Sequence, residues 1–200
     1  MTYDRQPLEE HELEELLEAA SLHSTTTEFI VRALARTGMR AAELAHMRVG
    51  WVEGDWDLIR LQHTDCRCGD CRQKASESED RTLDDYWLPK SEAGARPIPV
   101  SQEHGRFREV MADFFADRDR VGMSRQNVWY HCNKLNDEVS FDKPVLPHVL
   151  RHTFGTLAAY NGAEQAYIQD VMGHEDPSSS KAYIKMSGRQ VSEMHEQVWG

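Results

Sequence analysis

Five polar side chains that together could hold and cleave a phosphate ester occur in series along the 200-residue chain. They are Arg40 in T-G-M-R-A-A-E-L, His148 and Arg151 in H-V-L-R-H, His174 in M-G-H, and Tyr183 nine residues further on. An arginine presents a fork of N–H donors that matches phosphate oxygens. A tyrosine hydroxyl can attack phosphorus once a base or a cationic site activates it. The residue types therefore predict an anion-binding site with a nucleophile.

Each motif taken alone also has an ordinary structural explanation. Arg40 could form a surface ion pair with Glu43, one helical turn away, and the segment 148–151 could be a solvated helix face. His174 follows a glycine and could assist a helix C-cap. Tyr183 could be half-buried packing on an amphipathic helix. Only the ordered set favours a joint site over these alternatives.

As a set, the motifs resemble the catalytic domain of the tyrosine recombinase family, also called phage integrases, which includes the Xer-type resolvases. The family pattern T-G-x-R-x-x-E-L, H-x-x-R-H, L-G-H and a later tyrosine is matched, except that Met172 replaces the leucine. The family also uses a lysine on a β-hairpin, and Lys90 matches that position. The resemblance covers nearly the whole chain. It implies a catalytic set of Arg40, Lys90, His148, Arg151, His174 and Tyr183, supported by Glu43 and His152.

The resemblance implies an enzyme that breaks and rejoins DNA strands without a catalytic cofactor, metal or ATP. The two arginines and His174 would bind the non-bridging oxygens, where charge develops during the reaction. Tyr183 would attack phosphorus and form a 3′-phosphotyrosyl bond. His148 is the candidate base, and Lys90 would protonate the leaving 5′-hydroxyl.

Site-specific recombination of a mobile element, by integration, excision or resolution, is therefore the expected function. One alternative is a DNA-binding accessory protein of the same fold without activity. Another is a zinc-dependent structural or regulatory module, which would leave the arginines and Tyr183 unexplained. The expected partners are double-stranded DNA and further copies of the chain, as a tetramer. A tail helix within 187–200 is expected to pack on a neighbouring subunit, or alternatively on its own domain.

The expected fold class is mostly α with a small antiparallel β-sheet (α+β), the tyrosine recombinase catalytic-domain fold. Apolar spacing predicts a helix in Pro7–Ala20. Ser24 should cap a second helix that ends at Thr37-Gly38, and a short helix should begin near Arg40. Further helices are predicted at 103–119, 125–138 with a Ser124 cap, 147–160, 163–172, 177–185 and 189–198.

Three strands are predicted in the middle of the chain, at 57–63, 86–90 and 96–100, with a turn at 91–94. The prolines of the third restrict it to the edge of a sheet. We expect a single catalytic domain over 1–200, interrupted by an insertion at 63–85. Only two helices precede the first motif, which predicts a stand-alone catalytic domain or a fragment, without an N-terminal core-binding domain.

The insertion carries four potential metal ligands, His63, Cys66, Cys68 and Cys71. Three thiols and an imidazole can fill a closed tetrahedral site, which predicts a structural zinc knuckle. The alternative is a loop with reduced, unliganded thiols. The fourth cysteine, Cys132, lies in a predicted helix and is expected in the core.

The composition limits the remaining possibilities. The net charge is −11, and only 6 of the 23 basic residues are lysine, a balance that suggests a halophilic source. Such acidity disfavours DNA binding overall, but the local position of the arginines matters more. No apolar run is long enough to cross a bilayer, and the polar segment Met1–Glu10 is no secretory signal. These features predict a cytoplasmic protein without a membrane partner.

Overall fold

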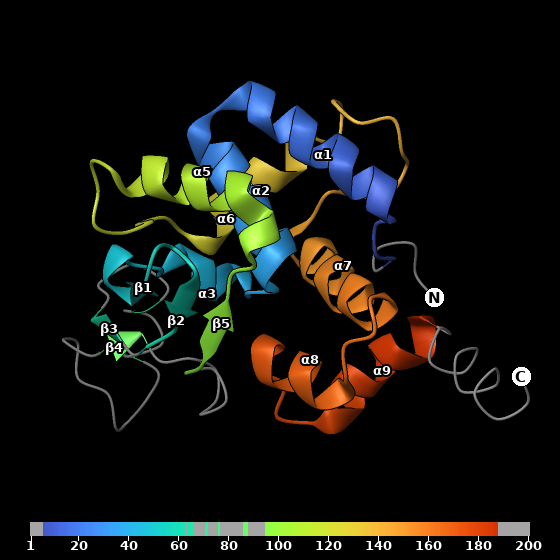
Figure 1. The fold of residues 1–200 in the computed structure, drawn as a ribbon. Helices are drawn as coiled ribbons and strands as arrows, with labels where there is room; N and C mark the ends of the chain where they lie inside the picture. The colour runs from blue at the N-terminus through green and yellow to red at the C-terminus, as the bar shows by residue number, and fades with distance from the viewer. Residues whose placement is uncertain are drawn as a thin grey trace, which may run out of the picture.

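The computed structural model describes residues 6–62, 64–65, 71, 76, 86–87 and 95–187. Most of these residues are helical, as expected (Figure 1). The helices are α1 (Glu10–His23), α2 (Thr25–Thr37), α3 (Ala41–Ala45), α5 (Gly105–Phe115), α6 (Arg125–Asn133), α7 (Pro147–Tyr160), α8 (Gln165–Met172) and α9 (Pro177–Ser187). The strands are β1 (Val52–Glu53), β2 (Leu58–Arg60), β3 (Thr64–Asp65), β4 (Tyr86–Trp87) and β5 (Pro97–Pro99).

Capping residues set both ends of α2 where the sequence predicts them. The Ser24 hydroxyl accepts a hydrogen bond from the Thr27 backbone N–H at 3.2 Å, which satisfies one of the free donors of the first turn. At the other end Gly38 adopts φ +62°, and its N–H donates to the Leu34 carbonyl. A Cβ at Gly38 would lie 2.5 Å from the Phe154 ring, so both the turn and the close approach of α7 require glycine.

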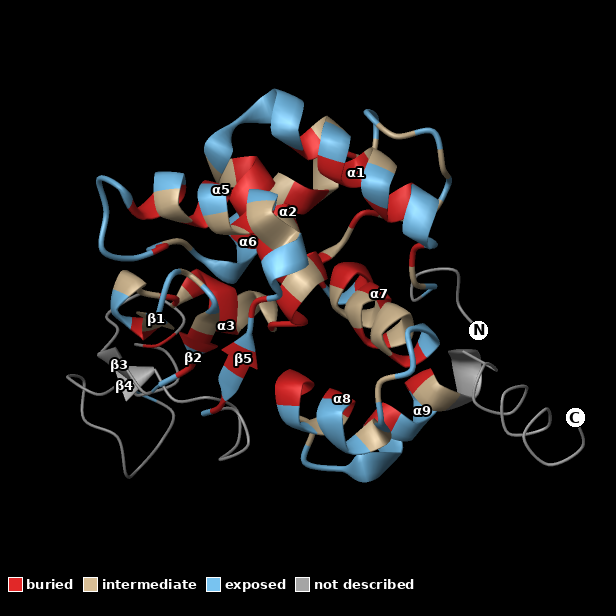
Figure 2. Ribbon diagram, in the orientation of Figure 1, coloured by how far each residue is buried: buried red, intermediate tan, exposed pale blue. Residues whose placement is uncertain are grey.

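The hydrophobic core surrounds α2, which packs against α1, α5 and α7. Phe29 of α2 stacks on Phe114 of α5, with ring centroids 4.1 Å apart. Figure 2 shows buried residues along α2 and on the sides of α1 and α7 that face it. The segment that ends at Gly38 is therefore held rigidly from several directions, and the predicted phosphate-binding Arg40 follows it directly.

The sheet has the order β1-β2-β5 and is antiparallel, with Ile59 opposite Ile98. As predicted, the proline-containing β5 lies at an edge, where Pro97 and Pro99 are exposed and Ile98 is buried. The predicted strand at 57–63 is instead shorter, because β2 ends at Arg60 and β3 pairs separately with β4.

The predicted strands at 86–90 and 96–100 are not paired with each other where the structure describes them. Instead, β4 pairs with β3 and β5 pairs with β2. The predicted turn at 91–94 and the predicted tail helix at 189–198 lie outside the described residues. Sequence reasoning also missed β1, which is only two residues long.

Two helices are shorter than the sequence predicts. The helix predicted at 103–119 begins with a 3₁₀ turn and becomes α-helical only over Gly105–Phe115. The helix predicted at 125–138 ends at Asn133, where the Asn136 side chain donates to the Asn133 carbonyl at 2.6 Å. This hydrogen bond satisfies a carbonyl at the end of the helix and stabilises the turn that follows. The Ser124 cap is confirmed by its contact with the Asn127 N–H.

Helices α8 and α9 pack at the side of the core, on α7, which itself belongs to the core. Helices α8 and α9 pack against each other and against α7, and α8 also contacts β5 (Figure 1). Proline at the first position of α7 favours a helix start there, and α7 matches the predicted range 147–160. No helix in the described part of the chain is long and apolar enough to cross a membrane.

Candidate active site

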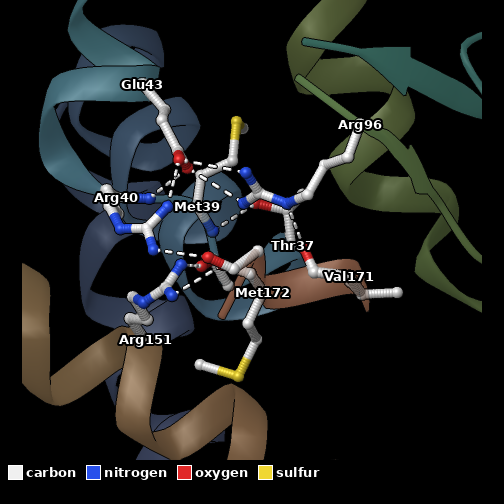
Figure 3. Close-up of polar contacts among 10 residues, drawn as sticks. Thr37, Met39, Arg40, Glu43, Arg96, Arg151, Val171 and Met172 are labelled. Carbon is white, nitrogen blue, oxygen red and sulfur yellow. Dashed lines mark hydrogen bonds and ion pairs between the residues drawn. The ribbon is translucent and has the colours of Figure 1, made fainter. Parts of the chain in front are cut away.

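Three arginines from separate elements meet at the C-terminal end of α8 (Figure 3). Arg40 is the N-cap residue of α3, Arg96 directly precedes β5, and Arg151 lies in α7. The side chains of Arg40 and Arg151 point to the same place, as a joint site requires.

Successive carbonyls at the end of α8 each accept a hydrogen bond from a different arginine. Arg96 Nε donates to the carbonyl of residue 171 at 2.6 Å, Arg151 Nη2 to that of 172 at 2.7 Å, and Arg40 Nη2 to that of 173 at 2.6 Å. Arg151 Nη1 also donates to the Gly38 carbonyl. The last carbonyls of a helix lack internal partners and carry partial negative charge, so the end of α8 orients all three guanidinium groups.

Glu43 is the carboxylate that organises two of these arginines. Its side chain is 2% exposed, and Arg40 reaches it at 2.7 Å from both the backbone N–H and Nη1. Arg96 binds both of its oxygens at 3.0 Å. Burial alone would raise the pKa of Glu43. The hydrogen bonds and charges of Arg96 and Arg40 together lower that pKa by more than burial raises it, so the net shift is downward. Glu43 is therefore ionised at neutral pH.

The cluster has a net positive charge although the chain is acidic. Burial and then the neighbouring Arg40 lower the pKa of Arg151 to about 10, which still leaves the side chain protonated at neutral pH. Three guanidinium groups and one carboxylate carry 3 − 1 = +2. A guanidinium has five N–H donors, and the contacts above use two of them on Arg40 and two on Arg151. The remaining donors suit a phosphate.

Tyr183 lies on α9 and is 4% exposed. Its hydroxyl is 2.9 Å from His152 Nδ1, and its ring lies against Gly155 of α7. Burial raises the pKa of Tyr183, and the charge of Arg151 opposes this only partly. The phenol is therefore neutral at physiological pH and needs a proton acceptor before it can attack.

His174 lies beside Tyr183, with ring centroids 6.0 Å apart and planes 15° apart. Its Nδ1 is 2.8 Å from the hydroxyl of the fully buried Ser180. Burial, followed by the charges of Arg151 and Arg40, lowers the pKa of His174 to about 4. The imidazole is therefore neutral at physiological pH. If the Ser180 hydroxyl donates to Nδ1, Nε2 carries the ring proton and can donate to an anion.

The lowered pKa of His174 predicts a loss of stability in acid. Its folded-state pKa of about 4 lies below the ordinary 6.5, so the unfolded chain binds more protons between these values. The stability is thus complete above about pH 6.5 and falls as the pH decreases towards 4. Burial also lowers the pKa values of His104 and His131, which act in the same direction. In His174→Gln, the stability should decrease less steeply between pH 6.5 and 4 than in the wild type, but should still decrease. Urea unfolding midpoints measured across this pH range test the prediction, and the same pH dependence in both proteins would contradict it.

Two of the predicted catalytic residues, Lys90 and His148, do not take part in the contacts described above. Lys90 lies outside the described residues. His148 is exposed on α7, and its ring centroid is 6.5 Å from that of His152. The Tyr183 hydroxyl bonds to His152 and not to His148.

The predicted metal ligands are described only in part. His63, Cys66 and Cys68 lie outside the described residues. Cys71 is described and is 8% exposed. No group of three His, Cys, Asp or Glu side chains able to hold a metal occurs within the described part of the chain. Cys132 is fully buried in the core, as predicted, and burial raises the pKa of its thiol.

Sequence reasoning missed Arg96 and Ser180 as site residues. Alternation along the third predicted strand places Arg96 on the same face as Ile98 and Val100, and all three are buried. A charged residue on the inward face of a strand indicates a buried ion pair. Ser180 precedes Tyr183 by three residues, so both share one face of α9. The alternation along the strand and the three-residue spacing on α9 are the sequence signals that could have identified Arg96 and Ser180.

Comparison with known proteins agrees with this geometry. A tyrosine recombinase XerD from Halalkalibacterium halodurans is 34% identical over 170 residues, covering 83% of this chain and 51% of the relative. A tyrosine recombinase XerD from Pseudomonas putida is 24% identical over 193 residues, covering 95% and 60%. The chain thus spans about half the length of the curated relatives that it matches.

Solved structures share the fold. The crystal structure of XerA recombinase superposes with a TM-score of 0.70 at 22% identity, covering 97% of this chain and 63% of that one. The Tn1549 transposon integrase in complex with transposon right end DNA gives 0.67 at 19% identity, covering 94% and 65%. The XerH recombinase in a post-cleavage complex with its difH substrate gives 0.65 at 14%, covering 96% and 52%. Residues 6–189 match the phage integrase family, and the chain belongs to that family.

Proposed function

We propose that this protein is a site-specific recombinase that cleaves and rejoins DNA through a 3′-phosphotyrosyl intermediate. The observation that carries the proposal is the convergence of Arg40 and Arg151 on the carbonyls of residues 172 and 173 at the end of α8. His174 directly follows these two residues in the sequence. A phosphodiester gains negative charge on its non-bridging oxygens as a nucleophile attacks. Preorganised donors aimed at developing charge are usually the largest contribution to catalysis.

The proposed step transfers the phosphoryl group from a DNA oxygen to Tyr183. The bond between the Tyr183 oxygen and phosphorus forms, and the bond to the 5′-oxygen breaks. The phenol proton passes to His148, and the 5′-oxygen takes a proton from Lys90, as the resemblance implies. Reversal with a different 5′-hydroxyl rejoins the strand, and the energy retained in the phosphotyrosyl bond removes the need for ATP.

Glu43 and His152 have supporting roles in this scheme. Glu43 holds Arg40 through the contacts at 2.7 Å, so the guanidinium is oriented before the substrate arrives. His152 holds the phenol through its 2.9 Å contact and keeps Tyr183 in the resting site. The proton acceptor assigned here, His148, lies one helical turn before His152.

Double-stranded DNA is the proposed substrate, and a tetramer of this chain on DNA is the proposed assembly. The similar XerH and Tn1549 integrase structures were solved with DNA. The positive arginine cluster gives an otherwise acidic chain a local site for a phosphate. We further propose that residues 1–200 act as one catalytic domain, and that the reaction integrates, excises or resolves a mobile element.

A nicked duplex that loses a short 5′-hydroxyl fragment after cleavage tests this function directly. Incubation of the protein with the radiolabelled duplex should yield a protein–DNA adduct that survives denaturing electrophoresis and disappears after protease treatment. The accessory-protein alternative predicts a shifted complex in a native gel but no adduct. Binding without any adduct, on duplexes that carry the element's junctions, would reject the enzymatic function.

A methyl group at Gly155 is expected to disturb the tyrosine. A Cβ there would lie 2.9 Å from Tyr183 Cε2 and Cζ and 3.0 Å from Met172 Sδ, so the ring must shift. We expect Gly155→Ala to lower the rate of adduct formation by about tenfold or more, since misplacement of a reacting group by about 1 Å can cost up to a hundredfold. Single-turnover cleavage measures this.

Gly105→Ala is the matched control, because nothing lies within 4 Å of a Cβ added at Gly105 in α5. Gly105 is the first residue of α5 and already has helical angles, φ −49° and ψ −45°, and replacing glycine by alanine at such a position stabilises a protein by about 0.4–1 kcal/mol. This control should therefore be as stable as the parent or more stable, with unchanged cleavage. A Gly155→Ala protein that cleaves as fast as this control would contradict the proposed importance of the contact.

A further inference from the structure

His174 lies in the turn that joins α8 to α9, and its backbone is fixed by the end of α8. Gly173 has φ +64°, and the His174 N–H donates to the Gln169 carbonyl at 3.0 Å. The carbonyl of Gly173 in turn accepts a hydrogen bond from Arg40 Nη2 at 2.6 Å. The imidazole of His174 therefore extends from a backbone segment that is bound to the arginine cluster.

The Nδ1 atom of this imidazole is held by a buried hydroxyl of α9. It lies 2.8 Å from the Ser180 oxygen, and Ser180 is 0% exposed. Within the part of the chain that the structure describes, the Ser180 hydroxyl has no second hydrogen-bond partner. If Nδ1 carried the ring proton, the Ser180 O–H would be a buried donor without an acceptor, which is costly. The favoured arrangement is therefore that Ser180 donates and Nδ1 accepts.

The opposite nitrogen, Nε2, is left for a ligand. It makes no hydrogen bond with any of the described residues. Among those residues, the Thr156 hydroxyl oxygen is the one side-chain N or O atom that is both closed to solvent and without a hydrogen bond, so Nε2 is open to solvent. Because Arg151 and Arg40 bind the carbonyls of residues 172 and 173, the ring lies next to the proposed phosphate site.

We propose that Ser180 is a positioning residue, whose hydroxyl holds His174 in the tautomer with the proton on Nε2, so that this N–H donates to a non-bridging oxygen of the DNA phosphate. The donation to DNA rests on the proposed function, whereas the tautomer rests on the contact with Ser180 alone. With the other tautomer, Nε2 would present a lone pair to the phosphate and could not donate to it.

The choice of tautomer matters because the ring is neutral. An imidazolium carries a proton on both nitrogens and would donate from either one. Burial, followed by the charge of Arg151, lowers the pKa of His174 to about 4. Near neutral pH only one nitrogen therefore carries a proton, and Ser180 decides which.

The same helix carries the proposed nucleophile. Ser180 precedes Tyr183 by three residues and shares its face of α9, and the rings of His174 and Tyr183 lie nearly parallel with centroids 6.0 Å apart. Helix α9 therefore orients a donor as well as the nucleophile, and Ser180 does so without touching the substrate.

Nitrogen NMR of the full chain without DNA tests the tautomer directly. In protein labelled with ¹⁵N-histidine at neutral pH, the His174 signals, identified by their loss in His174→Leu, should show a protonated Nε2 and an unprotonated Nδ1. In Ser180→Ala the two signals should move towards each other, because the second tautomer becomes populated. Ser179→Ala is the matched control on the exposed side of α9 and should keep the wild-type pattern. A proton on Nδ1 in the wild type, or no change in Ser180→Ala, would overturn the proposal.

Single-turnover cleavage of the nicked duplex tests the effect on the reaction. Ser180→Ala should slow adduct formation by about five- to tenfold, the usual contribution of one hydrogen bond between uncharged groups, whereas Ser179→Ala should not. In a His174→Leu background Ser180→Ala should have no further effect, because residues that act through one another are not additive. An equal loss in both backgrounds would show that Ser180 only supports the packing of α9, and this or an unchanged rate in Ser180→Ala would overturn the proposal.

The two measurements separate this inference from the proposed function. If the wild type forms no adduct but Ser180→Ala changes the tautomer of His174, the recombinase function is wrong and the role of Ser180 in setting the tautomer stands. If the adduct forms but the wild-type proton lies on Nδ1, the function stands and the role of Ser180 is wrong.

Discussion

Replacing Tyr183 with phenylalanine is expected to abolish the covalent protein–DNA adduct while leaving DNA binding intact. Phenylalanine keeps the ring that fills the space against Gly155 but removes the atom that would attack phosphorus. The variant also loses the hydrogen bond to His152, which costs about 1 kcal/mol of folding stability. Denaturing gels with a labelled nicked duplex measure the adduct, and native gels measure binding.

Tyr167→Phe is the matched control for this experiment. Tyr167 lies on α8 in the same part of the molecule, but 46% of it is exposed. This control should form the adduct at the wild-type rate. If Tyr183→Phe also formed it normally, another residue would have to be the nucleophile, and the proposed function would lose its central group.

The local parts of the fold could be predicted from the sequence because short-range chemistry decides them. Ser24 and Gly38 set the ends of α2 through contacts within a few residues. A proline and regular apolar spacing gave α7 its predicted limits. The candidate site residues were indicated by the resemblance of their motifs to the tyrosine recombinase family. The structure brings two of them, Arg40 and Arg151, together although they lie 111 positions apart in the sequence.

The remaining features depend on contacts that have no local signature. Nothing in 57–63 indicates where β2 ends and β3 begins, since the pairing of β2 with β5 and of β3 with β4 decides it. The hydrogen bond of Tyr183 to His152 depends on how α7 and α9 pack. The contact of His46 with Cys71 spans 25 positions and likewise has no local signature.

Arg96, which sequence reasoning missed, is expected to be important for both stability and activity. Its replacement by methionine should lower the free energy of unfolding and the cleavage rate. Arg96 is 7% exposed and binds both oxygens of Glu43, itself 2% exposed. Removing one partner of a buried ion pair costs about 3–5 kcal/mol when the other charge is left without compensation. Glu43 keeps Arg40 as a second partner, so the loss should lie near the lower end of this range. We expect Arg96→Met to lose stability on this scale in urea unfolding and to lose cleavage as well.

The exposed pair of Arg60 and Glu53 is the matched control. Its geometry is similarly bidentate, at 2.7 and 3.0 Å, but each side chain is 44% exposed. Solvent screens such pairs, and they contribute little to stability. Arg60→Met should therefore remain close to the wild type in both assays. Equal losses in Arg60→Met and Arg96→Met would contradict the importance of burial.

Arg96→Lys separates a positioning role from simple loss of structure. Lysine keeps the positive charge but cannot bind both oxygens of Glu43 at once. The hydrogen bonds from Arg96 oppose burial in setting the pKa of Glu43, so that pKa should rise in this variant. Glu43 would then take up a proton at a higher pH and release Arg40. The acid limb of the cleavage profile should move to higher pH, whereas a purely structural defect would lower the rate at every pH without moving it.

A double replacement, Glu43→Leu with Arg96→Met, completes the argument. Buried ion pairs can be exchanged for apolar residues with little loss of stability, because the desolvation cost disappears together with the attraction. We therefore expect the double variant to recover much of the stability that Arg96→Met loses. Cleavage should stay at least a hundredfold below the wild type, because Arg40 would have lost the carboxylate that orients its guanidinium. A double variant that cleaves as fast as the wild type would show that Glu43 and Arg96 contribute only packing, and that the end of α8 alone positions Arg40.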